Sequence, residues 1–227
     1  MTSSDLVNTA VSPLVIAIDG PAAAGKGTLA RRIAEHYGFA YLDSGRLYRA
    51  VGLALLEAGR DPHDEEAAAA AARALDPAIL NRPELRREAV GEAASIVAAM
   101  PAVRRALLSF QRQFARHPPG DAPGVVIDGR DIGTVICPDA DIKFFVTASD
   151  EERARRRQRE LAERGERADF MTVLADLKRR DARDARRATA PLKPADDAIL
   201  LDTTEMDIDA VFAAARRIID SRLQARQ

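Results

Sequence analysis

The chain has 227 residues, of which 47% are hydrophobic and 30% charged, a composition that suits one globular domain with a sizeable core. Its 34 Lys and Arg against 35 Asp and Glu exclude an overall field that would recruit nucleic acid or an anionic membrane. A single cysteine excludes an intramolecular disulfide, and three scattered histidines lack the spacing of a structural metal site. No signal peptide or membrane-spanning run is evident, so we expect a cytoplasmic protein without nucleic-acid or membrane partners.

Five short apolar runs predict the strands of a parallel sheet, because they alternate with longer helical patterns and are almost continuously apolar. The predicted strands are Val15–Ile18, Phe39–Leu42, Val125–Ile127, Lys143–Val146 and Ala198–Leu201. Asp19, Asp43 and Asp128 follow the first three strands directly. Ligands of open α/β sheets lie at the carboxyl ends of the strands, so these acids mark the expected site.

Helical patterns fill the rest of the chain. The alanine-rich stretch Glu65–Ala74 and the amphipathic stretch Pro83–Phe114 lie between the second and third strands and predict a helical cover. Residues Asp150–Arg187 carry arginine and glutamate at helical spacing and are interrupted at Gly165. Neither an internal repeat nor a linker divides the chain, so we predict one domain over residues 1–227.

The segment GPAAAGKGT, Gly20–Thr28, resembles the phosphate-binding pattern G-x-x-x-x-G-K-[ST] between an apolar strand and a helix. Its glycines let backbone N–H groups surround a phosphate, and Lys26 supplies a charge for the transferring phosphoryl group. Gly27 stands where the pattern has a hydroxyl, so the Mg²⁺ contact shifts to Thr28 or runs through water. The K-G-T ending is typical of kinases that phosphorylate the phosphate of another nucleotide.

A phosphate acceptor needs cations that face this loop, since two negative substrates must be brought together. Three segments after strand ends or on one helix face hold suitable side chains. They are Ser44, Tyr48 and Arg49 in LDSGRLYRA; Asp128, Arg130 and Asp131 in VVIDGRDIG; and Arg180, Asp184 and Arg187 in RRDARDARRATAPL. Together with the loop, they predict a phosphotransferase with a phosphate group as acceptor.

These segments, with GEAASIVAAMPAVR, resemble the bacterial cytidylate kinase family over nearly the whole chain from Val15 onward. Adenylate kinases would show D-G-F-P-R where this chain has Asp128–Asp131, and the N-K-x-D of GTPases is absent. The resemblance implies a P-loop α/β fold, with a five-stranded parallel sheet, helices on both faces, a helical nucleotide-binding insert and an arginine-rich lid. It implies a cytoplasmic monomer that uses ATP and Mg²⁺ to phosphorylate CMP and dCMP.

The resemblance also assigns boundaries and roles. It implies a flexible N-terminus at 1–13, a nucleotide-binding region at about 60–114 and a lid at about 158–190. ATP would contact Gly20, Pro21, Ala22, Ala23, Ala24, Gly25, Lys26, Gly27, Thr28, Arg153 and Arg157. The acceptor would contact Arg49, Arg130 and Arg187 through phosphate, Arg180 and Asp184 through ribose, and Ser95, Arg104 and Asp131 through cytosine, with Ser44 and Tyr48 beside it. Lys26, Arg130 and Arg187 would be catalytic, and Thr28 and Asp128 would hold Mg²⁺, in part through water.

The chain departs from the family in one place. Between Leu75 and Glu92 it is short, whereas the usual member carries a longer insert with a small antiparallel sheet, so we expect helices only. Two other functions stay open at this point: a P-loop kinase for UMP or a small metabolite, and a nucleotide-dependent switch that transfers no phosphate. The acceptor arginines argue against the switch, and the acids interleaved through the lid argue against an RNA-binding arm.

Overall fold

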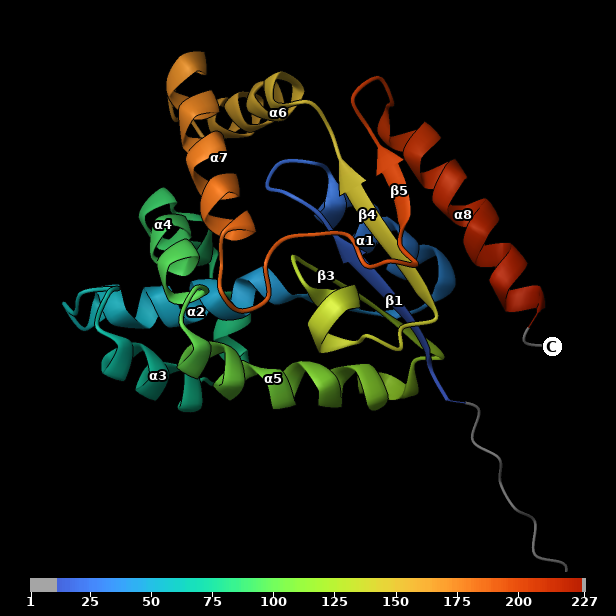
Figure 1. Ribbon diagram of the computed structural model, residues 1–227, viewed down its shortest axis with the longest axis horizontal. Helices are drawn as coiled ribbons and strands as arrows, with labels where there is room; N and C mark the ends of the chain where they lie inside the picture. The colour runs from blue at the N-terminus through green and yellow to red at the C-terminus, as the bar shows by residue number, and fades with distance from the viewer. Residues whose placement is uncertain (1–11, 226–227) are drawn as a thin grey trace, which may run out of the picture.

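A five-stranded parallel sheet lies at the centre of the computed structural model, which describes residues 12–225 (Figure 1). Its order is β2-β3-β1-β4-β5, and the strands are β1 (Leu14–Asp19), β2 (Ala40–Asp43), β3 (Gly124–Gly129), β4 (Ile142–Thr147) and β5 (Ile199–Asp202). All five predicted strands are present, with bounds that differ by one or two residues. The flexible terminus is predicted for residues 1–13, and residues 1–11 of it lie outside the described part of the chain.

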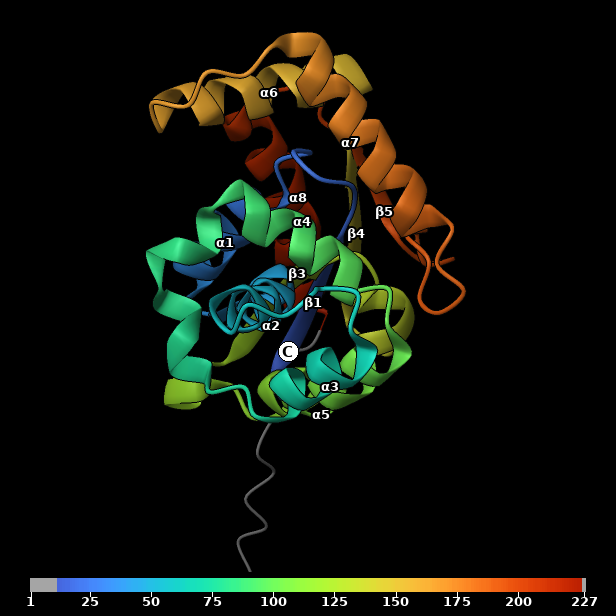
Figure 2. The same cartoon turned by 90° about the vertical axis from the view of Figure 1, so that its left-hand side faces the viewer.

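The sheet register brings the acidic strand ends together. Ile18 of β1 pairs with Asp128 of β3, and Asp43 of β2 pairs with Asp128 from the other side. Because all strands run in the same direction, their carboxyl ends meet at one edge, below the hairpin of α6 (Asp150–Glu163) and α7 (Phe170–Ala185) in Figure 2. The predicted location of the site at this edge is therefore consistent with the pairing.

Helices cover both faces of the sheet. On one face α1 (Lys26–Tyr37) and α8 (Ile208–Gln224) pack against Ile16, Ile18 and Phe144, which are fully or almost fully buried. On the other face α5 (Pro101–Arg116) and the π-helical turn η4 (Ile132–Ile136) cover β1 and β3. This double coverage explains why the strand sequences are apolar at nearly every position.

A second apolar cluster joins the helices between β2 and β3, on the left of Figure 1. It unites α2 (Ser44–Glu57), α3 (Glu65–Arg73), α4 (Glu88–Val97) and the first half of α5. The short 3₁₀ helices η1 (Pro77–Asn81) and η2 (Pro83–Arg86) lie at its borders, and a third, η3 (Pro119–Asp121), connects α5 to β3. The amphipathic stretch Pro83–Phe114 is thus divided into η2, α4 and α5, with Pro101 at the first position of α5, and no strand occurs within residues 60–114.

Helices α6 (Asp150–Glu163) and α7 (Phe170–Ala185) form a hairpin above the carboxyl edge of the sheet (Figure 2). Its chain reversal contains Gly165 at φ +76°, and its inner faces share an apolar cluster that includes Leu161 and Leu174. The hairpin begins before the predicted lid boundary, because α6 starts at residue 150. Within residues 12–225, no single helix has the length and apolar content of a membrane span; the bent pair Glu88–Val97 with Pro101–Asp121 reaches that threshold on length and composition only.

Candidate active site

The phosphate loop connects β1 to α1 in a conformation that its glycines permit. A Cβ on Gly20 would stand 2.0 Å from the carbonyl oxygen of Val146, so no side chain fits there. Gly25 precedes α1 with φ +91°, a backbone geometry that glycine adopts readily. Lys26 begins α1 and donates from Nζ to the Pro21 carbonyl at 3.0 Å, so its side chain curls back over the loop.

The space around Gly27 would admit a side chain, so steric crowding does not require glycine at this position. A Cβ at this position would meet the Tyr41 hydroxyl, an Arg31 guanidinium nitrogen and Asp128 Oδ2 at 3.6 to 3.7 Å, which are ordinary contact distances. Thr28, one residue further, is exposed and lines the cavity beside the loop. The hydroxyl that usually follows the lysine is therefore displaced by one residue along the first turn of α1.

Asp128 and Lys26 form the electrostatic centre of the site. Burial and the neighbouring Asp43 raise the pKa of Asp128 to about 7, against the lowering effect of Lys26. Burial and the nearby Arg130 lower the pKa of Lys26 to about 8. The Tyr41 hydroxyl donates to Asp128 Oδ1 at 2.9 Å. Two carboxylates beside a buried ammonium suit a site that receives both a cation and phosphate groups.

A polar pocket between α4, α5 and the end of β3 contains the residues predicted to contact a base. Arg104 donates to one oxygen of Asp131, to the Ala98 carbonyl at 3.1 Å, and lies 5.6 Å from the centre of the Tyr48 ring. Asp131 Oδ1 accepts no hydrogen bond from a described residue. Ser95 Oγ is buried and has no hydrogen-bond partner within residues 12–225, and Ser95 lines the cavity beside the phosphate loop. Unused polar atoms of this kind indicate a polar ligand.

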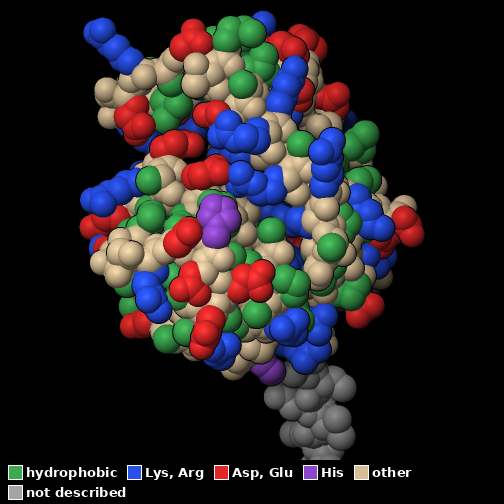
Figure 3. Space-filling view, turned by 60° about the vertical axis from the view of Figure 1, so that its left-hand side comes forward, with side chains coloured by type: hydrophobic (Ala, Val, Ile, Leu, Met, Phe, Trp, Pro, Cys, Tyr) green, Lys and Arg blue, Asp and Glu red, His purple; other side chains and the backbone are tan. Residues whose placement is uncertain are grey.

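Arg130, Asp184 and Arg187 meet across the gap between the sheet and the end of α7. Arg130 donates from Nε to Asp184 Oδ2 at 3.0 Å, and Arg187 donates to the other oxygen of the same carboxylate. Arg187 Nε is buried and has no partner among the described residues, so this guanidinium keeps a donor for a ligand. Figure 3 shows basic and acidic side chains gathered along the hollowed seam below the α6–α7 hairpin.

Arg49 lies against α4 because that helix has a glycine opposite it. A Cβ on Gly91 would stand 3.0 Å from an Arg49 guanidinium nitrogen, and Arg49 donates to the Leu85 carbonyl at 2.8 Å. Burial and the nearby Arg180 lower the pKa of Arg49 to about 10. Like charges crowded in this way are stabilised by an incoming anion.

Arg153, which the resemblance assigns to ATP, lies beside the phosphate loop. Its side chain is almost completely buried at the base of α6, where it contacts Asp150 and Asp181 and donates to the Ala22 carbonyl of the phosphate loop at 3.2 Å. It does not line the cavity, whereas Arg157, one turn further along α6, does. Arg153 therefore supports the phosphate loop from behind in this structure.

The cavity itself has a volume of about 390 Å³. Of the predicted site residues, it is lined by Ala22, Ala23, Gly25, Lys26, Gly27, Thr28, Ser44, Tyr48, Arg49, Ser95, Arg104, Asp128, Arg130, Asp131, Arg157, Arg180, Asp184 and Arg187. Gly20 and Pro21 do not line it, and Ala24 lines the second hollow described below instead. Asp43, which marks the end of a strand in the sequence as Asp128 does, also lines the cavity. Arg31 and Glu160 line it too, although no pattern in the sequence points to them.

A second hollow lies on the other side of the phosphate loop. It has a volume of about 530 Å³, and its lining includes Ile208 at the start of α8 and Arg156 of α6. Ala23, Gly25 and Thr28 line both hollows. The loop therefore stands between two adjoining spaces, an arrangement that suits two ligands joined by their phosphates.

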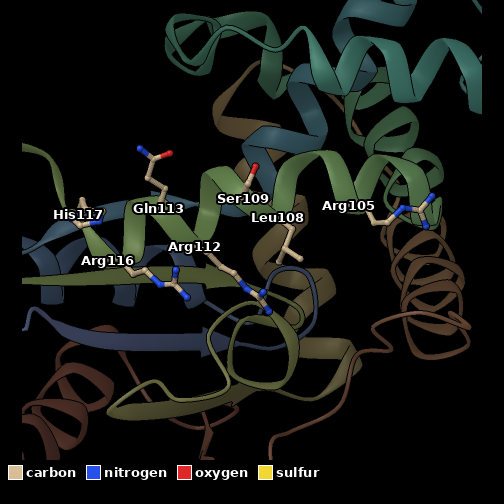
Figure 4. Close-up of a pocket in the computed structure, with 7 residues that line it drawn as sticks. All are labelled: Arg105, Leu108, Ser109, Arg112, Gln113, Arg116 and His117. Carbon is tan, nitrogen blue, oxygen red and sulfur yellow. The ribbon is translucent and has the colours of Figure 1, made fainter.

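A groove on the flank of α5 lacks these features. It is lined by Arg105, Leu108, Ser109, Arg112, Gln113, Arg116 and His117. Figure 4 shows these side chains spread along one helix, α5. Arg112 donates to the carbonyls of Val135 and Ile136 at 3.0 and 3.1 Å, so this guanidinium joins α5 to η4. The groove contributes to packing and not to the site.

Comparison with known proteins agrees with the site. The family model for cytidylate kinase matches residues 16–221. The chain belongs to the cytidylate kinase family. Curated cytidylate kinases from Methylocella silvestris and Brucella suis biovar 1 are each 58% identical to it, and the alignments cover 92% and 94% of this chain and 94% and 95% of theirs. That of Rhodospirillum rubrum is 56% identical over 93% of this chain and 99% of its own.

Solved structures with low identity support the fold. An uncharacterised protein from Eubacterium ventriosum superposes with a TM-score of 0.52 and 17% identity, over 92% of this chain and 99% of that chain. The protein is thus a P-loop kinase with a five-stranded parallel sheet, as the sequence predicts. The coverage of the cytidylate kinases also indicates that the short segment after Leu75 is compatible with family membership.

Proposed function

We propose that this kinase transfers the γ-phosphoryl group of ATP to the phosphate of CMP or dCMP and so forms CDP or dCDP. The observation that carries the proposal is the phosphate loop between two hollows, with unpaired polar atoms in the hollow that Ser95 and Asp131 line. The acceptor would lie in that hollow, and the donor base would lie in the one beside α8. No nucleophile from the protein is needed, because an oxygen of the acceptor phosphate attacks in line.

The arginines supply the charge that this reaction requires. Arg49, Arg130 and Arg187 would hold the acceptor phosphate, and Lys26 with Arg130 and Arg187 would stabilise the charge that develops on the migrating group. Arg157 would contact the donor phosphates, while Arg180 and Asp184 would contact the ribose. The α6–α7 hairpin covers this place and would exclude water, which limits the competing hydrolysis of ATP.

The base would be selected by Asp131, Arg104 and Ser95. Cytosine presents an exocyclic amine beside two acceptors, and Asp131 Oδ1 can accept from that amine while Arg104 and Ser95 donate to the acceptors. Uracil presents a carbonyl oxygen where cytosine has its amine, which a carboxylate repels. The pocket therefore favours CMP over UMP.

The residues present also fit a magnesium ion. Mg²⁺ is bound in such sites by one or two oxygen ligands of the protein together with substrate phosphates and water. Thr28 and Asp128 line the cavity beside the loop, and within residues 12–225 no cluster of three or more His, Cys, Asp or Glu side chains offers a site of protein ligands alone. Thr28 and Asp128 would hold the ion, and when bound it neutralises charge on the phosphates.

We also propose that the protein works as a monomer in a reducing cytoplasm, a compartment that suits a protein with one cysteine. The function is tested with a coupled assay of ADP release at fixed ATP and Mg²⁺ across CMP, dCMP, UMP, AMP and GMP. CMP and dCMP should give kcat/KM values well above those of the other acceptors. Equal or higher values for UMP, or for a purine nucleotide, would contradict the proposal.

A further inference from the structure

The first turn of α4 places one carboxylate among several guanidinium groups. Glu88 accepts a hydrogen bond from Arg157 of α6, and its other oxygen lies 4.0 Å from a nitrogen of Arg180 on α7. Arg49 of α2 is close enough for Glu88 to raise its pKa, although burial and Arg180 lower it more. Glu88 is thus the acid shared by arginines from three helices.

The same three arginines line the cavity and are those proposed to contact the two nucleotides. A carboxylate and a phosphate accept hydrogen bonds from the same guanidinium N–H groups. We infer that Glu88 is a resident counterion that competes with the phosphates of the nucleotides for Arg157 and Arg49 and screens the charge of Arg180, and thereby sets the affinity for the nucleotide. This inference rests on the proposed function, since it takes the competing ligand to be a nucleotide phosphate.

A simpler role for Glu88 would be to hold the hairpin closed, and the structure offers a matched residue whose ion pair does this outside the cavity. Glu92, one turn further along α4, pairs with Arg183 of α7 at 2.7 Å. Arg183 does not line the cavity. Both glutamates are partly exposed and both join α4 to α7. Glu88 is hydrogen-bonded to the cavity-lining Arg157, whereas Glu92 is hydrogen-bonded to Arg183 and feels the cavity-lining Arg180 only at longer range.

The two roles have opposite effects on binding. If Glu88 only closes the hairpin, its removal leaves a more open site and weakens the binding of CMP, as removal of Glu92 does. If Glu88 competes with phosphate, its removal leaves the positive charges of Arg49, Arg157 and Arg180 without their carboxylate, so an incoming phosphate gains more. Glutamine keeps the length of the side chain and removes only the charge.

The experiment is calorimetric titration of CMP, and separately of cytidine, into wild type, Glu88→Gln and Glu92→Gln. For CMP, the Kd of Glu88→Gln should fall about twofold to fivefold, the range expected when partly exposed ion pairs no longer compete. The Kd of Glu92→Gln should stay the same or rise. Cytidine, which lacks the phosphate, should bind wild type and Glu88→Gln with the same affinity.

Two results would overturn the inference: a CMP affinity of Glu88→Gln equal to or weaker than that of Glu92→Gln, or an equal gain for cytidine and CMP. Wild type that binds no CMP at all would instead overturn the proposed function, and this inference with it. Thermal melting of both variants checks that the fold is kept, which the partial exposure of the two glutamates leads us to expect.

Discussion

Replacement of Asp131 by asparagine should change both the selection of the base and the stability of the protein, and the two effects can be measured separately. The Asp131–Arg104 pair is almost sealed from solvent, with side-chain exposures of 5% and 7%. Breaking a buried pair costs about 3 kcal/mol or more, which for a chain of this length lowers Tm by roughly 6 to 12 °C. Asparagine can still offer its oxygen to Arg104, but it then turns an amide donor toward the base.

The change should lower kcat/KM for CMP and leave that for UMP unchanged or higher. Loss of a base-edge contact of roughly 1 to 3 kcal/mol corresponds to about a tenfold to hundredfold fall for CMP. The assay is steady-state ADP release with each acceptor, well below the Tm of the variant. The CMP to UMP ratio is the decisive quantity, because a general loss of folded enzyme lowers both values alike.

Asp184→Asn is the matched control. Asp184 is also a buried carboxylate, and it accepts hydrogen bonds from Arg130 and Arg187. Unlike Asp131, it is proposed to contact the ribose, which CMP and UMP share. This variant should lower kcat/KM for both acceptors in the same proportion. An unchanged ratio in Asp131→Asn, or an equal change of ratio in Asp184→Asn, would refute the assignment of Asp131 to the base.

Three further predictions concern the loop, the strand end and the hairpin. Lys26→Met should keep its fold and lose on the order of 10²-fold or more in kcat. The control Lys143→Met removes a buried lysine that pairs with Asp197 at 2.9 Å outside the cavity, and it should keep the kcat of wild type. A near-normal kcat for Lys26→Met would contradict the role of Lys26 in phosphoryl transfer. Burial raises the pKa of Asp19 to about 6 in the folded protein. The ionised Asp19 carboxylate therefore destabilises the fold above that pH, and the destabilisation is lost as the pH falls and the carboxylate is protonated. When the pH is lowered from 7.5 to 5, wild type should gain about 1 kcal/mol in free energy of unfolding relative to Asp19→Asn, measured by urea denaturation. A difference between the two proteins that does not change with pH would contradict the raised pKa of Asp19. Hydrogen exchange across residues 165–187 should slow when CMP and a non-hydrolysable ATP analogue are added together, and unchanged exchange would contradict closure of the hairpin over substrate.

The sheet and the phosphate loop could be predicted from the sequence because their signals are local. An apolar run of three or four residues followed by aspartate identifies a buried strand and its carboxyl end. Gly20 and Gly25 with Lys26 identify a loop whose shape follows from backbone sterics. Parallel pairing then brings Asp43 and Asp128 to one edge without further information.

The directions of long side chains could not be predicted in the same way. Helical spacing places Arg153 and Arg157 near one face of α6, yet Arg153 turns inward to Asp181 and the loop, while Arg157 reaches Glu88. Their partners lie on segments that are distant in the sequence, and only packing of α6 against α7 and α4 decides between them. The same holds for the contact of Arg104 with Asp131.

The central claim is transfer of a phosphoryl group from ATP to the phosphate of CMP. The most direct measurement follows γ-³²P-labelled ATP with wild type in the presence and absence of CMP, with separation of CDP from inorganic phosphate. We expect the label in CDP, only when CMP is present, and little of it in phosphate. Label that accumulates only in inorganic phosphate, at the same rate with and without CMP, would contradict the account.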